Sequence, residues 1–138
     1  MWNLRLSMIL YAAILMAEGI VMWLDPAEVA KVLGFNIFDS MAGLDAMNFV
    51  SYIFSLMGAA LIAGGFVFIV GSVNPKKNVN VVRFAILWSA LTLAGEIYSM
   101  IKGYVTFSSI WSNFVITAIF LLAFLIFFPW PWRRESYR

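Results

Sequence analysis

The sequence predicts an all-α fold, an integral membrane four-helix bundle that forms one domain over residues 1–138. Hydrophobic residues make up 64% of the chain and charged residues only 12%, whereas soluble domains carry roughly 25% charged residues. A helix that crosses a bilayer needs about 20 mostly apolar residues. Four such windows are present, at about residues 4–24, 46–70, 81–101 and 110–128. They occupy most of the chain, so we expect no separate soluble catalytic domain.

The first window is expected to remain attached as a span, although Arg5 before an apolar run is also typical of a secretory signal peptide. The run is long and contains Glu18, and Asp25-Pro26 follows it in place of a small-residue cleavage site.

The connection after the first span contains the signals of a short outer helix. At residues 25–28, the sequence DPAE has an N-cap aspartate, a proline at the first helical position and a glutamate three residues after the cap. Val29, Val32 and Leu33 share a face, and Gly34 is a candidate C-cap. We expect an amphipathic helix along the outer membrane surface; a plain connector is the alternative.

The second and fourth spans differ in their small and aromatic residues. The second span has a row of small side chains that would let a neighbouring helix approach closely: Ser51, Ser55, Ala59 and Ala63. Its glycines at 64, 65 and 71 also predict close helix packing. The fourth span has the polar pair Asn113 and Thr117, followed by Phe120, Phe124, Phe127 and Phe128. We expect this span to face lipid or a partner.

The distribution of basic residues predicts the orientation. With four spans, both termini and the connection between spans two and three lie on one side of the membrane. That side collects seven of the nine basic residues: Arg5, Lys76, Lys77, Arg83, Arg133, Arg134 and Arg138. Lys31 and Lys102 lie on the other side. The positive-inside rule therefore places both termini in the cytoplasm, in the cell (inner or plasma) membrane.

The residues that are missing limit the chemistry. The chain has no cysteine and no histidine, which excludes disulfides, thiolate or imidazole zinc sites and histidine-ligated haem. Any metal would need hard oxygen ligands. No phosphate-binding loop or Ser/His/Asp set is present, and the basic tail at residues 129–138 is typical of an interface anchor. We predict no cofactor and no nucleic-acid partner.

Two carboxylates within the spans are the candidate site. Glu18 lies six residues before Leu24, and Glu96 lies five before Ile101, on spans that run in the same direction. At about 1.5 Å per residue, both lie roughly 8 to 9 Å below the outer ends of their spans. An acidic residue at the centre of a span costs about 2.5 to 3.5 kcal/mol on insertion scales, and less near the interface. Such residues are candidate functional sites.

Polar side chains accompany both carboxylates by helical periodicity. The candidate ligand- or proton-binding set is Glu18, Glu96, Tyr11, Thr92, Ser99, Ser51 and Tyr52. One interpretation is an outward-open polar pocket that binds a cation, a proton or a polar head group, in which the carboxylates share a proton. The alternative is a structural pair, protonated and hydrogen-bonded across the bundle. If spans one and three are diagonal, the carboxylates meet only through the centre, where Ser51 or Tyr52 would bridge them.

The chain resembles the DoxX-like group of small four-span membrane proteins. The resemblance covers nearly the whole chain and rests on LRLSMILYAAILMAEGIVMWLDP at the start, SLMGAALIAGG in the second span, and a glycine-containing end to the third. It implies a partnership, because that group is associated with accessory subunits of membrane oxidoreductases.

A second, local resemblance concerns AILMAEG at residues 13–19, which is similar to the first span of the small multidrug resistance exporters. The resemblance implies that Glu18, and no other residue of this chain, alternately binds a proton and a cationic drug. This chain is longer, has a larger outer loop, and does not match that family's glycine-rich third span or its tryptophan site at residues 81–101.

Three functions are compatible with these observations. The first is a non-enzymatic accessory or stabilising subunit of a larger membrane complex, including an oxidoreductase complex, with the lipid bilayer and other subunits or itself as partners. The second is a proton- or cation-coupled small transporter that acts as a homo-oligomer through Glu18 and Glu96. The third is an enzyme that uses the two carboxylates as acid and base, although no nucleophile, metal-ligand set or cofactor motif accompanies them.

Overall fold

The computed structural model describes residues 2–32 and 44–128, and this part of the chain contains five α-helices and no strand. The helices are α1 (Trp2–Leu24), α2 (Pro26–Val32), α3 (Leu44–Ser72), α4 (Val79–Ile101) and α5 (Phe107–Phe127). Four are long and apolar enough to cross a membrane: α1, α4 and α5 over their full lengths, and α3 from Asn48 to Ser72. The prediction of an all-α chain with four helices long and apolar enough to span a membrane is confirmed.

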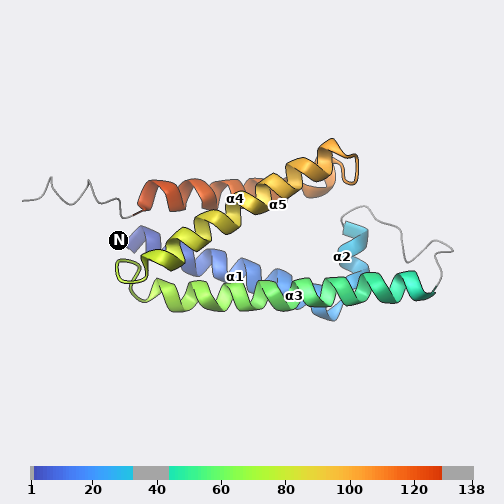
Figure 1. Ribbon diagram of the computed structural model, residues 1–138, viewed down its shortest axis with the longest axis horizontal. Helices are drawn as coiled ribbons and strands as arrows, with labels where there is room; N and C mark the ends of the chain where they lie inside the picture. The colour runs from blue at the N-terminus through green and yellow to red at the C-terminus, as the bar shows by residue number, and fades with distance from the viewer. Residues whose placement is uncertain (1, 33–43, 129–138) are drawn as a thin grey trace, which may run out of the picture.

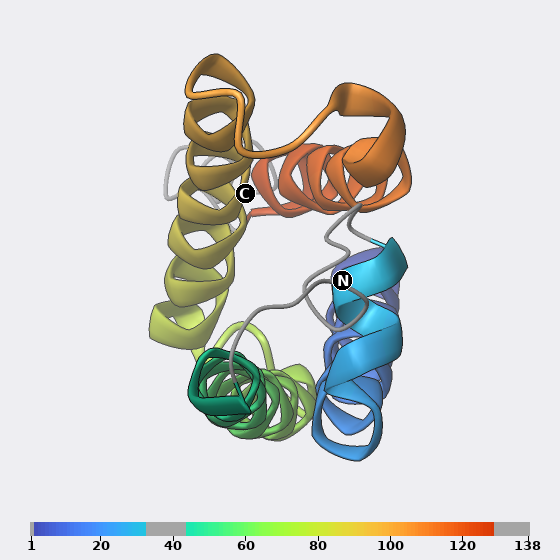
Figure 2. The same cartoon turned by 90° about the vertical axis from the view of Figure 1, so that its right-hand side faces the viewer.

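The four long helices form a bundle with a square cross-section. Seen from one end, they follow one another around the square in the order α1, α3, α4, α5 (Figure 2). The pairs that pack together are α1 with α3, α3 with α4, α4 with α5, and α5 with α1. The first and third spans, α1 and α4, therefore lie diagonally, which is one of the two arrangements that the sequence left open. α1 and α3 run side by side, whereas α4 diverges from α3 away from their connection (Figure 1).

Glycines on both helices create the close packing of α1 against α3. A Cβ atom built on Gly58 would lie 2.6 Å from the carbonyl oxygen of Gly19, and a Cβ atom on Gly19 would lie 2.6 Å from that of Gly58. One heptad further along α3, a Cβ on Gly65 would lie 2.9 Å from the Ala12 carbonyl oxygen. Small residues of this kind let two backbones approach within a membrane.

This seam differs from the row of small residues expected on the second span. Glycines seven residues apart make the close contacts, while Ala63, the last member of the expected row, is exposed. The reason is helical geometry. Steps of four residues drift by about 40° each around a helix of 3.6 residues per turn, whereas a step of seven drifts by only about 20°.

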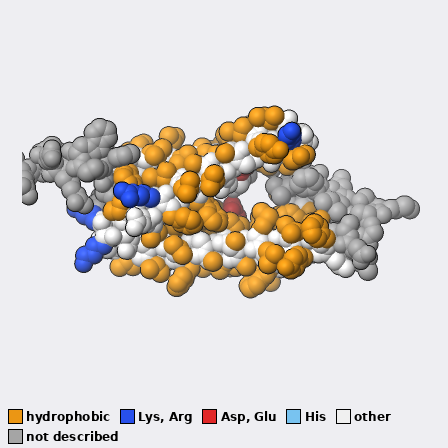
Figure 3. Space-filling model, in the orientation of Figure 1, with side chains coloured by type: hydrophobic (Ala, Val, Ile, Leu, Met, Phe, Trp, Pro, Cys, Tyr) orange, Lys and Arg blue, Asp and Glu red, His pale blue; other side chains and the backbone are white. Residues whose placement is uncertain are grey.

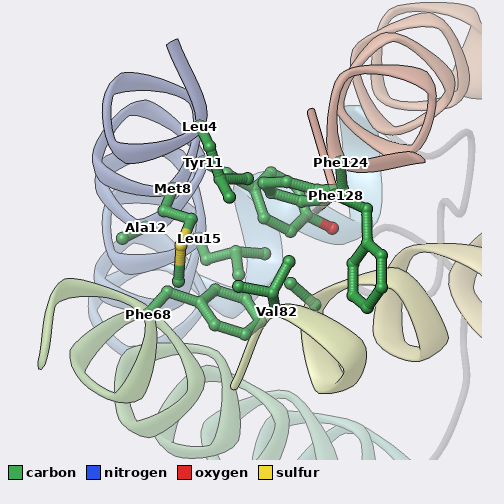
Figure 4. Packing of buried hydrophobic residues seen from close by; sticks show 10 residues of the cluster. Leu4, Met8, Tyr11, Ala12, Leu15, Phe68, Val82, Phe124 and Phe128 are labelled. Atoms are coloured by element: carbon green, nitrogen blue, oxygen red, sulfur yellow. The ribbon is translucent and has the colours of Figure 1, made fainter. Parts of the chain in front are cut away.

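An aromatic cluster fills the half of the bundle in which α1 begins (Figure 4). This half is called the inner half below, and the half that ends at α2 is called the outer half. Tyr11 lies at the centre of the cluster, with ring centroids 5.7 Å from Phe68, 4.9 Å from Phe120 and 5.5 Å from Phe124. Phe124 is fully buried. The expectation that the fourth span faces lipid or a partner is therefore wrong for its phenylalanines, since Phe128 is also buried and Phe127 packs against the same cluster. Phe120 and Phe124 are the two that lie next to the centre of the cluster. They pack on Tyr11, because offset and edge-to-face contacts between rings are favourable.

The short outer helix is present as predicted, and its cap is formed by Asp25. The Asp25 carboxylate accepts a hydrogen bond from the backbone N–H of Glu28 at 3.0 Å. Ala30 of α2 is fully buried, so the helix packs across the outer end of the bundle (Figure 1). Leu33, which was predicted to belong to the apolar face of this helix, and Gly34, its predicted C-cap, lie outside the described residues.

Replacing Asp25 by alanine is expected to destabilise α2 locally by about 1 kcal/mol, the usual value for an N-cap. The backbone N–H of Glu28 would lose its acceptor. Hydrogen exchange of the α2 amides would measure the change, with Asp25→Asn as a matched control that keeps a capping oxygen. Unchanged protection in Asp25→Ala would contradict the assigned cap.

Candidate ligand-binding cavity

Two adjoining chambers occupy the outer half of the bundle, above the aromatic cluster. The inner chamber has a volume of about 240 Å³ and the outer one about 570 Å³. They share five lining residues: Glu18, Met22, Met57, Thr92 and Asn113. The inner chamber is otherwise lined by Tyr11, Trp88, Thr117 and the aliphatic residues Ile14, Leu15, Leu61 and Ile116. Below it, the Tyr11 cluster closes the bundle, so the cavity is closed at its inner end.

Glu18 is held at the boundary between the two chambers by the packing of its own helix. It lines both chambers and directly precedes Gly19, whose contact with Gly58 fixes this turn of α1 against α3. Adjacent positions on a helix point about 100° apart. When Gly19 faces α3, Glu18 consequently points toward the centre of the bundle.

Glu96 reaches the outer chamber from the diagonal helix α4 and is anchored by α5. Its Oε1 accepts a hydrogen bond from the side-chain amide of Asn113. Its Oε2 is buried and has no hydrogen-bond partner among the described residues. A buried acceptor without a partner costs about 1 to 3 kcal/mol, and more when it is charged. The site therefore offers an oxygen atom that a bound donor would satisfy.

Glu18 of α1 and Glu96 of α4 line the outer chamber from helices that lie diagonally in the bundle. Neither carboxylate has a basic partner among the described residues. In the described part of the chain, the one ion pair joins Lys31 to Glu28, at 3.9 Å on the surface. Like charges without a nearby cation repel, so the pair favours a shared proton or a bound cation.

Three of the other predicted residues lie along this cavity. Thr92 lines both chambers, and its hydroxyl donates to the Trp88 carbonyl oxygen at 3.0 Å. Ser99 lines the outer chamber. Tyr11 forms part of the floor of the inner chamber, which Glu18 also lines. The structure thus brings Glu18, Glu96, Tyr11, Thr92 and Ser99 together around one cavity.

Ser51 and Tyr52 line neither chamber. Tyr52 is 60% exposed on the outside of α3, and the Ser51 carbonyl oxygen accepts a local hydrogen bond from Ser55. The expected bridge between the carboxylates through Ser51 or Tyr52 is therefore not formed. Because α3 turns its glycine face toward α1, Met57 is its one described residue that lines the outer chamber.

Asn113 was missing from the predicted site, although it makes the direct contact with Glu96. Asn113 and Thr117 are one turn apart, and both line the inner chamber. The signal that would have found them is this polar pair in an otherwise apolar span, because polar side chains within membranes tend to face the protein interior.

The donor set suits a monovalent cation better than a multivalent metal ion. Among the described residues, no group of three or more acidic, histidine or cysteine side chains is placed to hold a metal. Ca²⁺ takes six to eight oxygen ligands, and Mg²⁺ requires near-octahedral coordination. Two carboxylates that hold one proton carry a single negative charge, which a monovalent cation matches.

Comparison of the chain with protein-family models, with curated proteins and with solved structures gives no match.

Proposed function

We propose that this protein binds a monovalent cation at Glu18 and Glu96 in exchange for a proton, as the binding step of a proton- or cation-coupled carrier. The observation that supports this proposal best is the cavity, which is closed at its inner end and lined by Glu18 and Glu96 from diagonal helices. Glu28 of α2 also lines the outer chamber, but it is paired with Lys31. No basic side chain among the described residues pairs with Glu18 or Glu96.

The electrostatics of the cavity favour exchange over permanent occupancy. Two ionised carboxylates at one site within the bilayer repel each other and have lost much of their hydration. A proton shared by the two carboxylates removes one of the two negative charges. When a cation enters and this proton leaves, the cation stabilises the carboxylate that becomes ionised. Competition between proton and cation for one site is the feature by which a carrier couples their movements.

Basic residues support a cytoplasmic position of both termini and a cavity that opens to the outside. In the described part, Lys and Arg side chains gather at the end of the bundle where α1 begins and α3 connects to α4 (Figure 3). Arg5, Lys76 and Lys77 belong to that end. The positive-inside rule favours a cytoplasmic position for such an end. With the protein in the cell membrane, as we propose, the outer chamber would face out.

A binding measurement in lipid nanodiscs tests the proposal, with ethylammonium as the probe cation. We expect saturable binding to the native chain, with one proton released for each cation bound in weakly buffered solution. Glu18→Gln and Glu96→Gln are each expected to weaken binding at least about tenfold, because a charge-assisted hydrogen bond contributes about 1.5 to 3 kcal/mol. Asp25→Asn is the control, since it removes an acid outside the cavity and keeps the α2 cap. Binding without proton release, or binding that survives both glutamine variants, would overturn the proposal.

A second candidate function is an accessory subunit of a larger membrane complex, in line with the DoxX-like resemblance. The outer face of α5 favours it, because a row of exposed apolar residues there follows the spacing of a helix-packing seam: Trp111, Val115, Ile119 and Leu122. This candidate predicts stoichiometric partner subunits on a native gel after mild detergent extraction, identified by mass spectrometry. A monomer or homo-oligomer would argue against it.

A further inference from the structure

The outer chamber has a side opening between α3 and α4. These two helices pack together near their connection and then diverge (Figure 1). In the space-filling view, a hollow lies between them, and acidic side chains are visible at its floor (Figure 3). This opening is distinct from the outer end of the bundle, which α2 crosses (Figure 1).

Met57 and Gly95 form the two sides of the opening. Met57 of α3 lines both chambers and is nevertheless 47% exposed. Gly95 of α4 lines the outer chamber, and a Cβ atom built on it would meet no atom within 4 Å. Beside Glu96, the chamber is therefore open at Gly95 of α4, and on the α3 side only the Met57 side chain separates it from the surroundings.

The opening lies at the depth of the hydrocarbon, not of water. Gly95 is six residues before Ile101, the end of α4, which places it about 9 Å below the outer end of that span. The hydrocarbon core of a bilayer is about 30 Å thick, so the opening faces the outer leaflet. Large apolar side chains surround it on the outside, including Leu56 on α3 and Leu91 on α4.

We propose that this opening is a lateral portal through which a primary alkylammonium binds, with its head at Glu18 and Glu96 and its chain in the outer leaflet. The proposal rests on the proposed function and names the ligand class of that site. A primary ammonium has three N–H donors. The acceptors near the portal are the unpartnered Oε2 of Glu96, the carboxylate of Glu18 and the hydroxyl of Thr92. The hydrocarbon chain leaves past Gly95 without entering water.

Gly95→Trp closes the portal without altering either carboxylate. The site is open space, so a large side chain fits there and projects across the opening. Gly95→Ala is the matched control, because it also replaces glycine by a better helix former but fills almost none of the opening. Met57→Trp, with Met57→Leu as its control, fills the opening from the other side should Gly95→Trp fail to fold.

The test compares tritiated decylamine with tritiated ethylamine, which carry the same ammonium head at neutral pH, in a scintillation proximity assay on nanodiscs. Binding to empty nanodiscs is subtracted. We expect the native chain to bind decylammonium at least about tenfold more tightly than ethylammonium. In Gly95→Trp the ratio of the two affinities should fall to about one, and Gly95→Ala should keep the native ratio.

The possible results separate the portal from the proposed function. If Gly95→Trp leaves decylammonium affinity intact, or weakens both probes equally, the portal is overturned while the carboxylate site stands. If ethylammonium fails to bind the native chain, or binds equally well to Glu18→Gln and Glu96→Gln, the proposed function fails and the portal with it.

Discussion

Replacing Gly58 by leucine is expected to disrupt the bundle, with a loss of stability above about 3 kcal/mol, the upper end of the usual cost of overpacking. A Cβ atom at this position would lie 2.6 Å from the carbonyl oxygen of Gly19, and backbone atoms cannot move aside as a flexible side chain can. The two helices would have to separate. They would lose the contact between Gly65 and Ala12 and turn Glu18 away from the cavity.

Gly95→Leu is the matched control for this prediction, because it makes the same chemical change at a site where a Cβ meets nothing within 4 Å. We expect it to be neutral or slightly stabilising, since glycine inside a helix costs about 1 kcal/mol relative to good helix formers. Unfolding in detergent micelles, followed by circular dichroism and size-exclusion chromatography, would measure both variants. Equal unfolding midpoints for the two variants would show that α1 and α3 do not pack through Gly19 and Gly58.

Replacing Asn113 by leucine is expected to weaken ethylammonium binding about tenfold and to destabilise the protein by about 1 to 3 kcal/mol, the cost of an unsatisfied buried polar group. The Asn113 side-chain amide donates a hydrogen bond to Oε1 of Glu96. The other carboxylate oxygen, Oε2, has no hydrogen-bond partner among the described residues. Without this amide, the carboxylate would be held less firmly on α4. The ionised form that a cation needs would also lose its stabilising donor.

Thr117→Val is the control for Asn113. Thr117 lies one turn further along α5 and lines the inner chamber, with no described hydrogen bond to either glutamate. Nanodisc binding and micelle unfolding should both be close to native for this variant. If Asn113→Leu behaves like Thr117→Val in the binding assay, Asn113 is not a positioning residue for Glu96.

Local chemistry was sufficient to predict several elements. Twenty or more apolar residues in a row form a spanning helix wherever the helix packs, because every backbone group must be hydrogen-bonded within the bilayer. The cap of α2 depends on Asp25 and Glu28, three residues apart. The equal depth predicted for Glu18 and Glu96 rests on the rise per residue and on the parallel direction of their spans.

Facing directions were harder to predict, because lipid and the protein interior are both apolar. In a soluble bundle, the polar side of a helix identifies its outer face. In this chain, Phe124 in the aromatic cluster and Leu122 on the outer surface of the same helix are both large and hydrophobic, and only their burial differs. Tyr52 looked like a polar pocket residue, yet it is exposed, because Gly58 turns the other side of α3 toward α1.

From its sequence alone, this chain can be recognised as a membrane protein with four spans, a capped outer helix and two carboxylates at one depth. Each of these properties depends on composition or on residues close together in the chain. Three others needed the tertiary structure: the diagonal placement of α1 and α4, the hydrogen bond from Asn113 to Glu96, and the opening beside Gly95. These depend on how four similarly apolar surfaces rotate against one another, and that rotation is set by close packing at a few glycines and aromatic rings.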